Sequence, residues 1–554
     1  MVGNVGISPK WALAWGASIG AVYVVWLLPI NHLAGTSGLW WIGDPGAHVS
    51  ALRAYLNDDW HVPILYTRHL NYPEGINAAF ADVIPLVAVP TKMFADLLPP
   101  DFHYFGYWLA FSYVLQGVAA AWLLHLMGVR DRVMLPLAVV LFLLSPAMLF
   151  RVHAHAALTF HAAILIALAL YFLMTRPGAI SNRSLMLSLA MLACVALLVH
   201  PYLLAMVVPI FMVGLVDRAR LCDHGMSAQA VVLLGALAPV IFIMWAGGYL
   251  THGVGQLSGG GGFGFNSMNL VAPLIGGHFL DMPSLQDQSG LYGTWPVPYD
   301  ATGGQFEGYN HLGLGVIVGL LIVVMTQWRR LPSLVRRHAG LFLLMVGFTL
   351  YAISNKAFAA GIGLWEISLP QWMMPLAEQF RASGRFFWPV GYLLVLCMVL
   401  GLSALRGPSL GRVLLAGLVV VQVADTAPLR GMTREAAALE APMQMNDSWW
   451  QHQAERAERI YLFPAFGCGA HAFEDIVPLQ RLAAFSATPF NTGLIARGVG
   501  NCVDKESVLA EGLMDGSLYV FLDDYIDETE LVSRFGTQVE QRCTPFSGGH
   551  VCTP

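Results

Sequence analysis

Hydrophobic runs long enough to cross a bilayer recur along the first 424 residues of the chain. A transmembrane helix needs roughly 20 predominantly apolar residues, with a range of about 17–25. The runs predict about eleven spans, near residues 11–30, 104–127, 133–150, 159–174, 185–199, 202–217, 229–250, 310–328, 340–355, 387–405 and 412–424. His200-Pro201 interrupts the run over 185–217, which is therefore either two spans joined by a turn or one long broken helix.

The pattern changes after residue 424, where short apolar segments alternate with polar ones. Residues 460–463 and 518–522 have the pattern of short buried strands, and 474–485, 504–514 and 527–535 have helical spacing. We expect an α-helical polytopic membrane domain over 1–424 and a small soluble α/β domain over 425–554.

Composition supports this division. The chain is 56% hydrophobic and only 11% charged, which excludes an ordinary soluble enzyme. A net charge of -5 without a basic block excludes a nucleic-acid-binding protein. Residues 1–424 contain 20 basic and 16 acidic residues, whereas 425–554 contain 9 basic and 18 acidic residues. The two parts therefore suit different solvents, lipid and water.

The few basic residues of the first part predict its orientation. They occur in every second connection if His200-Pro201 is a turn, at Arg130/Arg132, Arg176/Arg183, Arg218/Arg220, Arg329/Arg330/Arg336/Arg337 and Arg406/Arg412. The positive-inside rule places these connections and the N-terminus in the cytoplasm. Loops 31–103, 251–309 and 356–386 and the tail then face outward, into the periplasm of a bacterium. No small-residue cleavage site follows the first run, so it is read as a retained helix.

Four cysteines lie in the tail, in the compartment predicted to be oxidising. An even number there indicates two disulfides with three possible pairings, and proximity favours Cys468 with Cys502 and Cys543 with Cys552. Four free thiols in a reducing compartment are the alternative, and they would reverse the topology.

The first outward loop carries candidate carboxylates. Asp44 follows the first span between aromatic residues and a Gly-Pro-Gly turn, close to His48. An acid in apolar surroundings has a raised proton affinity and can act as a general base. The alternative is that Asp44 only caps a helix from about Ala47 to Leu56. Asp82, in an apolar stretch, is the second candidate, and Glu74 and Glu307 are further candidates for substrate binding.

Basic residues gather at the outward ends of the third to sixth spans. Arg151, His155, His161 and His200 are candidates for binding an anion or sugar hydroxyls, and the alternative is that they only mark the membrane interface. Tyr309, in the later sequence EGYNHLG, is a further candidate for substrate binding. The histidines do not have the i, i+4 spacing of a helical zinc site, so a divalent metal is possible but not favoured.

Arg381 and Arg385 precede the tenth span and are spaced i, i+4, which predicts one helical face. Two outward arginines at the bilayer surface run against the positive-inside trend. Their guanidinium forks match phosphate oxygens, so we expect them to bind a lipid phosphate or pyrophosphate. Anchoring to lipid headgroups without catalysis is the alternative.

Several of these stretches resemble the GT-C class of membrane glycosyltransferases, and more narrowly a bacterial membrane family of unassigned activity that is placed with it. The resemblance covers most of residues 35–400 and leaves the tail outside. It rests on GDPGAHVSALRAYL, YPEGINAAFADVIPL, FHYFGYWLAFSYVLQG, RVHAHAALTFH, HPYLL, GGFGFNSMNL, EGYNHLGLG and RASGRFFWP.

The resemblance implies transfer of a sugar from a polyprenyl-phosphate donor to a glycan, lipid or protein acceptor, on the outer face and with inversion. Asp44 would be the general base, and Arg381 and Arg385 would stabilise the departing phosphate. Pro45 follows Asp44 where many GT-C members have a second acid, which favours an enzyme without a metal or other cofactor.

Two other functions stay open from the sequence. The same charged residues could line a pathway in a transporter or flippase for a lipid-linked or anionic solute, although no duplicated halves are visible. An oligosaccharide ligase with a pyrophosphate-linked donor is also compatible with the two arginines.

Overall fold

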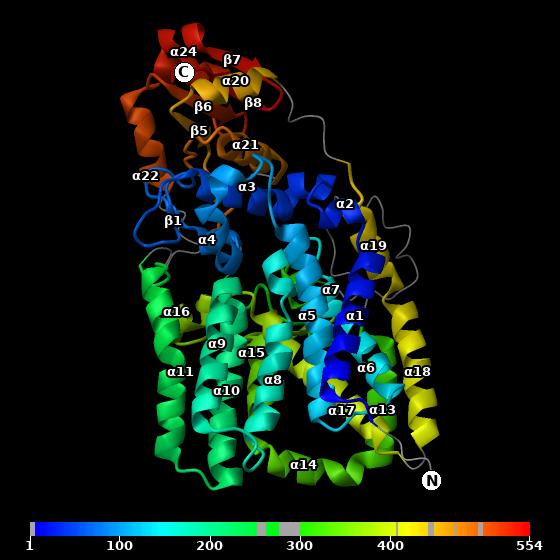
Figure 1. The fold of residues 1–554 in the computed structure, drawn as a ribbon. Coiled ribbons are helices and arrows are strands. Elements are labelled where there is room, and N and C mark those ends of the chain that lie inside the picture. Colours follow the sequence, from blue (N-terminus) through cyan, green and yellow to red (C-terminus); the bar gives the residue numbers. More distant parts are fainter. Residues whose placement is uncertain are drawn as a thin grey trace.

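The computed structural model describes residues 6–251, 262–275, 300–405, 408–440, 448–469, 473–496 and 502–554. Apolar helices form a bundle at one end, the C-terminal domain lies at the other, and short helices of the first loop lie between them (Figure 1). We call the end of the bundle that faces the C-terminal domain the tail side and the opposite end the far side. Most of loop 251–309, namely 252–261 and 276–299, falls outside the described residues.

The bundle confirms a multi-pass membrane protein. Among the described residues, eight helical segments are long and apolar enough to cross a bilayer: Pro9–Leu27, Phe105–Leu126, Ala156–Met174, Asn182–Val199, Pro201–Cys222, Met226–Ala246, Leu314–Arg337 and Ser383–Ser403. They contain the helices α1 (Pro9–Leu27), α5 (Phe105–Leu126), α8 (Ala162–Met174), α9 (Asn182–Val199), α10 (Pro201–Cys222), α11 (Met226–Ala246), α13 (Leu314–Gln327), α14 (Leu331–Arg337) and α17 (Trp388–Ser403).

The expected number of about eleven spans is not confirmed. Helices α18 (Pro408–Asp425) and α19 (Ala427–Ala437) form a pair bent by 48°, which would make a ninth span. The predicted spans 133–150 and 340–355 correspond to α6 (Met134–Leu143) and α15 (Ala339–Ile353), which are shorter. At 1.5 Å per residue α6 is about 15 Å long, half of a bilayer core of about 30 Å.

The segment around His200-Pro201 is a turn rather than a kink. His200 is extended, with φ -165° and ψ 132°, and α9 and α10 pack against each other on either side of it. Pro201 occupies the first position of α10, where its missing N–H costs nothing. The structure therefore chooses the first of the two predicted alternatives.

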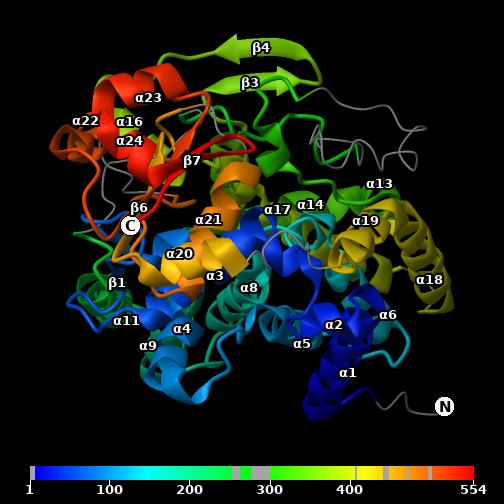
Figure 2. The same cartoon turned by 90° about the horizontal axis from the view of Figure 1, so that it is seen from above.

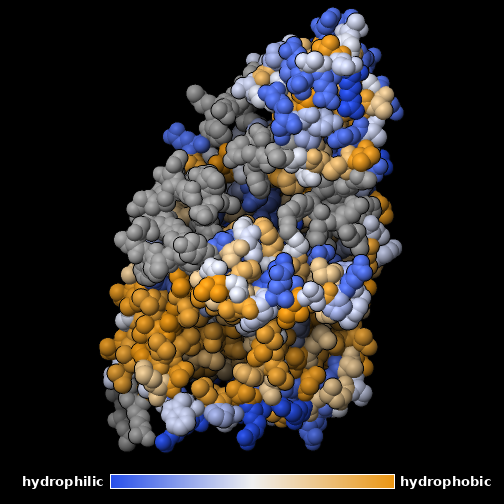
Figure 3. Space-filling model, turned by 180° about the vertical axis from the view of Figure 1, so that it is seen from behind, coloured by the Kyte–Doolittle hydropathy of each residue, from blue (hydrophilic) through white to orange (hydrophobic). Residues whose placement is uncertain are grey.

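Basic connections meet on the far side. The Arg412 guanidinium pairs with Asp131, that of Arg176 donates to the Leu126 carbonyl, and that of Arg220 donates to the Arg337 carbonyl. On the face shown in Figure 3 hydrophobic residues form a band over the helices, with hydrophilic residues below it and above it. This distribution is the one that the positive-inside pattern predicts, and which compartment each side faces stays a prediction.

Glycines bring α1 and α5 into close contact. A Cβ atom on Gly16 would meet the Gly117 carbonyl, one on Gly20 would meet the Tyr113 carbonyl, and one on Gly117 would meet the Gly16 carbonyl. Gly16 and Gly20 are spaced as in the small-xxx-small patterns that allow membrane helices to approach closely. Backbone contact between these helices therefore requires glycine at these positions.

Short elements cover the tail side of the bundle. In the first loop they are α2 (Ile30–Leu33), η1 (Gly38–Trp41), α3 (Gly43–Asn57), β1 (Tyr66–Thr67), β2 (Ile76–Asn77), η2 (Ala78–Ala81), α4 (Pro85–Met93) and η3 (Ala95–Leu97). Later in the chain they are α7 (Pro146–Leu149), η4 (Ala156–Thr159), η6 (Gln305–Gly308), β3 (Lys356–Ala359), β4 (Ile362–Glu366), η8 (Gln371–Met373), α16 (Met374–Ala377), η9 (Glu378–Phe380) and η10 (Ser383–Phe387).

The C-terminal domain is the small α/β domain that the sequence predicts. Its four-stranded sheet has the order β5-β6-β8-β7, with β5 and β6 parallel and the other pairs antiparallel. The two favoured disulfides, Cys468–Cys502 and Cys543–Cys552, are present. Its elements are α20 (Ser448–Arg456), β5 (Arg459–Phe463), α21 (Phe473–Phe485), α22 (Cys502–Glu506), η12 (Ser507–Glu511), β6 (Ser517–Leu522), α23 (Glu528–Phe535), α24 (Thr537–Arg542), β7 (Cys543–Phe546) and β8 (Gly549–Cys552).

Helix α21 joins this domain to the first loop by packing along α3. The Gln480 side chain donates to the Ala47 carbonyl at 3.0 Å, and Asn57 donates to the Ala484 carbonyl at 2.8 Å. A Cβ atom on Gly46 would lie 3.1 Å from Val477. One face of α3 therefore belongs to the interface with the C-terminal domain.

Substituting Gly117 tests the contact between α1 and α5. Gly117→Ala places a methyl group against the α1 backbone, and overpacking of this kind costs about 1–3 kcal/mol. Gly417→Ala in α18 is the matched control, because no atom lies within 4 Å of its added Cβ and alanine is the better helix former. Thermal unfolding in detergent should show a lower Tm for Gly117→Ala and an equal or higher Tm for Gly417→Ala. Equal behaviour of the two variants would refute the close contact.

Candidate active site

Six segments that are distant in the sequence meet at the tail side of the bundle. Each contributes one or two charged or imidazole side chains from a loop or a helix end. These are Asp44 and His48 on the first two turns of α3, Asp82 after η2, Arg151 and His155 between α7 and η4, His200 before α10, Glu307 in η6, Arg381 after η9 and Arg385 in η10.

Asp82 is surrounded by three histidines. One carboxylate oxygen lies 3.0 Å from Nδ1 of His155 and 3.4 Å from Nε2 of His48, and the other lies 3.2 Å from Nε2 of His200. His200 Nδ1 accepts the Tyr202 backbone N–H, so its Nε2 carries the proton and donates to Asp82. Burial opposes ionisation, yet the hydrogen bonds from His155 and His200 hold the pKa of Asp82 well below its usual value.

The backbone around Asp82 is in an unusual conformation. Asp82 and Ile84 have φ values of 56° and 52°, in the left-handed region that a β-branched residue rarely adopts. Ile84 is fully buried, so packing must offset a cost on the order of 1–3 kcal/mol. Such strain is concentrated at functional sites, and here it aims the Asp82 carboxylate at the histidines.

His155 connects all three carboxylates of the site. Besides Asp82, its Nε2 lies 3.9 Å from Asp44 and 3.9 Å from Glu307. Burial lowers the pKa of His155, but the hydrogen bond to Asp82 and the charges of Asp44, Asp82 and Glu307 raise it above its ordinary value overall. The charged imidazolium is thereby favoured, and it offsets part of the negative charge around it.

Asp44 is the most accessible of these carboxylates. Its side chain is 30% exposed, against 15% for Asp82 and 11% for Glu307. Helix α3 begins at Gly43, so Asp44 lies in its first turn and Ile42 occupies the cap position. Among the described residues its ion pair is with His155, at 3.9 Å, which leaves its oxygens able to accept a proton from a bound molecule.

Glu307 lies between two buried arginines. One carboxylate oxygen accepts from Arg151 at 2.6 Å and from Nε and one terminal nitrogen of Arg385 at 2.9 and 2.8 Å. Arg151 is 1% exposed, and a second nitrogen of its guanidinium donates to the Glu307 carbonyl. Burial opposes ionisation of Glu307, but the two guanidinium groups hold its pKa well below the ordinary value.

Arg381 and Arg385 do not share a helical face as expected. Arg381 follows η9, Ala382 has ψ 63°, and Arg385 lies in the separate turn η10. Arg385 lies over the ring of Tyr202, at 4.8 Å from its centroid. The i, i+4 spacing does not put them on one face because the helix is broken at Ala382, where a new 3-10 segment starts. Both arginines nevertheless lie on the same side of the membrane domain.

Other predicted residues lie outside this cluster. His161 binds the Tyr392 hydroxyl at 2.8 Å and packs on Trp388 within the membrane-spanning part. Tyr309 packs against Phe150, and Glu74 is exposed in a loop that reaches the C-terminal domain. None of the described contacts joins these three side chains to Asp82.

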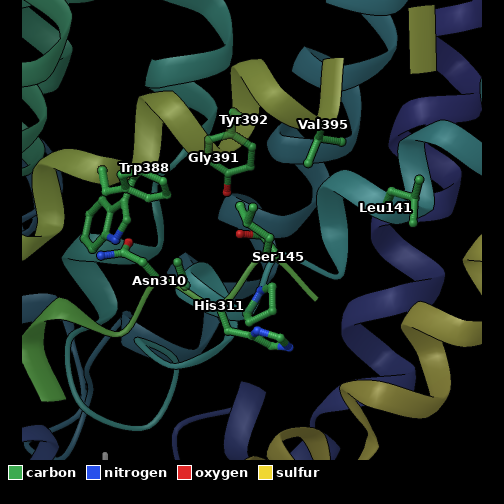
Figure 4. A pocket seen from close by; sticks show the side chains of 12 residues that line it. Leu141, Ser145, Asn310, His311, Trp388, Gly391, Tyr392 and Val395 are labelled. Atoms are coloured by element: carbon green, nitrogen blue, oxygen red, sulfur yellow. The ribbon is translucent and has the colours of Figure 1, made fainter. Parts of the chain in front are cut away.

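A small pocket lies beside Trp388, over whose ring the Arg151 guanidinium is placed (Figure 4). Its polar lining includes Ser145, Asn310, His311, Trp388 and Tyr392. Within the described part of the chain, Asn310 Oδ1, His311 Nδ1 and Trp388 Nε1 have no hydrogen-bond partner. A hydroxyl group or a water molecule could satisfy these atoms. The sequence analysis missed this pocket, although Asn310 and Trp388 belong to motifs that it singled out.

One set of side chains could hold a metal ion. His48, Asp82 and His155 each offer a ligand atom within 4.8 Å of the other two. Histidine nitrogen and carboxylate oxygen are suitable ligands for zinc, but ligation requires neutral imidazoles. A metal ion bound here would therefore have to displace the proton of His155.

A sequence model described as a domain of unknown function, DUF6311, matches residues 17–427. The chain belongs to the DUF6311 family. A second model, for the DUF6311 C-terminal domain, matches residues 449–554, so this DUF6311 protein carries a family-specific tail that its linear motifs did not reveal. Comparison with curated proteins gives no match.

Solved structures that are similar to this chain include an arabinofuranosyltransferase and an oligosaccharyltransferase. Arabinofuranosyltransferase AftD from Mycobacteria matches with a TM-score of 0.50 and 14% identity over 98% of this chain and 39% of its own, so this DUF6311 protein spans about two fifths of that relative. ArnT from Cupriavidus metallidurans matches with a TM-score of 0.49 and 14% identity over 97% of each chain. AglB from Archaeoglobus fulgidus matches with a TM-score of 0.42 and 12% identity over 93% of this chain and 69% of its own. The AftD match confirms the expected GT-C-like fold.

Glu307→Gln tests the buried charge cluster. The substitution keeps the shape of the side chain but leaves Arg151 and Arg385 without a counter-ion, and breaking a buried pair costs about 3–5 kcal/mol. Glu366→Gln is the control, because the Glu366 side chain is 66% exposed and surface substitutions change stability by only about 0.5 kcal/mol. Unfolding curves in detergent should separate the two variants clearly. A Glu307→Gln variant as stable as the control would disprove the role assigned to this carboxylate.

Proposed function

We propose that this protein is an inverting glycosyltransferase that uses a polyprenyl-phosphate-linked sugar. It would act on the tail side, in the periplasm, from the cytoplasmic membrane of a bacterium. The acceptor would be a glycan, a lipid or a protein. A membrane-embedded fold shared with an arabinofuranosyltransferase supports glycosyl transfer as the type of reaction.

The observation that carries the proposal is the position of Asp44. It is the accessible carboxylate in a cluster whose other two acids are held by histidines and arginines. In an inverting transfer one base removes the proton of the acceptor hydroxyl as that oxygen attacks the anomeric carbon. Asp44 would accept this proton, and the neighbouring His155, whose Nε2 lies 3.9 Å away, would hold the carboxylate in position.

The leaving group of such a reaction is a phosphate that gains negative charge. Arg151, Arg381 and Arg385 bring three guanidinium groups to the site, and Glu307 is the carboxylate that pairs with Arg151 and Arg385. Preorganised cations placed where charge develops are commonly the largest contribution to catalysis. Arg381, the most accessible of the three, is therefore proposed to contact the phosphate.

The placement of the charged groups also favours transfer over transport. The site residues lie in loops and at helix ends on the tail side, from the start of α3 to η10. A transport pathway needs ionisable or polar groups near the middle of the bilayer. A transfer reaction at one membrane surface requires charged groups at that surface only, which is where these residues lie.

Asp44→Asn tests the base. In proteoliposomes with labelled polyprenyl-phosphate sugars, release of polyprenyl phosphate should fall by about 10²–10⁴-fold, the usual contribution of a general base. Asp59→Asn, in an exposed turn of the same loop, should retain activity. The anomeric configuration of the product reports inversion. Full activity of a folded Asp44→Asn protein would rule out Asp44 as the base.

Metal removal tests the proposal that no metal is needed. We expect transfer to survive chelation by EDTA and elemental analysis of the purified protein to find far less than one zinc or manganese ion per chain. His48→Asn serves as a comparison because His48 is one of the three potential ligands. A stoichiometric ion that is lost in His48→Asn, together with activity, would overturn metal independence.

A further inference from the structure

A second apolar surface, separate from the helices of the bundle, lies on the hairpin of β3 and β4 and the segment that follows it. Every residue of β4 is exposed. The exposed fractions are 68% for Ile362, 49% for Leu364, 42% for Trp365, 56% for Ile367 and 73% for Trp372. Soluble surfaces rarely carry a contiguous apolar patch of this kind unless something binds there.

The hairpin begins at the tail-side edge of the membrane belt. Helix α15 ends at Ile353 and β3 starts at Lys356, a separation of about 10 Å at most for an extended chain. The Tyr351 hydroxyl, on the last turn of α15, donates to the Ala377 carbonyl, so the returning segment lies at the same level. The hairpin therefore lies close to the boundary between lipid and water.

Its apolar surface continues the lipid-facing side of α15. Phe342, Leu343, Val346 and Leu350 are exposed along that helix, and the exposed side chains of β4 follow after only a few residues. Seen from above, the two strands lie side by side at the rim of the molecule, with β4 outside β3 (Figure 2). The hairpin and the segment after it, residues 356–373, thus extend the hydrophobic belt outward. We call these residues the ledge.

The charge of this ledge also suits a lipid surface. Residues 357–373 contain one charged residue, Glu366, and it pairs with Lys356 at 2.6 Å at the base of the hairpin. Tryptophan is enriched where membranes meet water, because its ring is apolar and its N–H is polar. A water-soluble partner would ordinarily be met by a surface with more charges at its rim.

We propose that the β3–β4 ledge rests in the tail-side leaflet of the membrane in which the helices are embedded. Ile362, Leu364, Trp365, Ile367 and Trp372 enter the boundary between headgroups and acyl chains. The inference is independent of the proposed reaction, because it rests on exposure, position and charge alone.

The ledge is also connected to the candidate site. The Phe358 carbonyl accepts the Leu270 N–H, and Asn269 accepts the Ala360 N–H through its side chain. A few residues earlier the Asn266 carbonyl accepts the Gly384 N–H, next to Arg385. Contact of the ledge with lipid therefore fixes one wall of the site relative to the membrane surface.

Spin labelling of the full chain in nanodiscs of phosphatidylethanolamine and phosphatidylglycerol tests the proposal. After the free cysteines Cys194, Cys222 and Cys397 are replaced by serine, Leu364→Cys is labelled in the ledge. Leu343→Cys on α15 is the lipid-facing control, and Glu528→Cys on α23 is the water-facing control. Collision rates are then measured with oxygen, which concentrates in lipid, and with a nickel complex, which stays in water.

The label at 364 should resemble that at 343, with an oxygen-to-nickel ratio several-fold above that at 528. A ratio equal to that at 528 would show a ledge in water and overturn the proposal. Protection from both reagents would also overturn it, because a second copy of the chain or another protein segment would then cover β4. Trp372→Cys should repeat the result, and gel filtration of each labelled protein confirms that it is folded.

Discussion

The ion pairs of Glu307 with Arg151 and Arg385 are the interaction on which the tail side of the molecule depends. Three charged groups in surroundings with little water are tolerated only when they neutralise one another, so the segments that carry them must meet in one arrangement. Neighbouring contacts enforce the same arrangement: Asn310 donates to the carbonyls of Gly308 and Gly384, and these two glycines touch through their backbones. The helix ends that surround the site are fixed by this junction.

Charge neutralisation also separates the roles of the carboxylates. Asp82 and Glu307 are held by strong partners, which suits groups that keep a site in shape. Asp44 lies one helical turn from His48 and faces His155 at a longer distance, so it retains the capacity to exchange a proton. A carboxylate near a cation thus stabilises the structure of the site at Asp82 and Glu307, whereas at Asp44 it remains available to a bound molecule.

Hydropathy alone predicted most of the helical bundle and the two-part organisation, because lipid imposes a length and a composition on every span. The number of spans that it gave, about eleven, is not confirmed, because α6 and α15 have only 10 and 15 residues. Candidate side chains could be named from the sequence, but their pairing could not. Arg151 and Glu307 are 156 positions apart, and no periodicity connects them. Glu74 was chosen for its motif, yet its loop faces the C-terminal domain. Strands β7 and β8 were missed because four-residue segments with polar residues give little signal.

The packing of α21 on α3 makes the C-terminal domain a support for the candidate site. Its place in the sequence suggests an appendage, but α3 uses one face for Asp44 and His48 and another for Gln480 and Val477 of α21. Removing the C-terminal domain would expose one face of α3, the helix that carries the candidate base Asp44. The two parts of the chain therefore form one mechanical unit. A substitution on the α3 side of this interface is expected to require a compensating substitution on the α21 side, and the reverse.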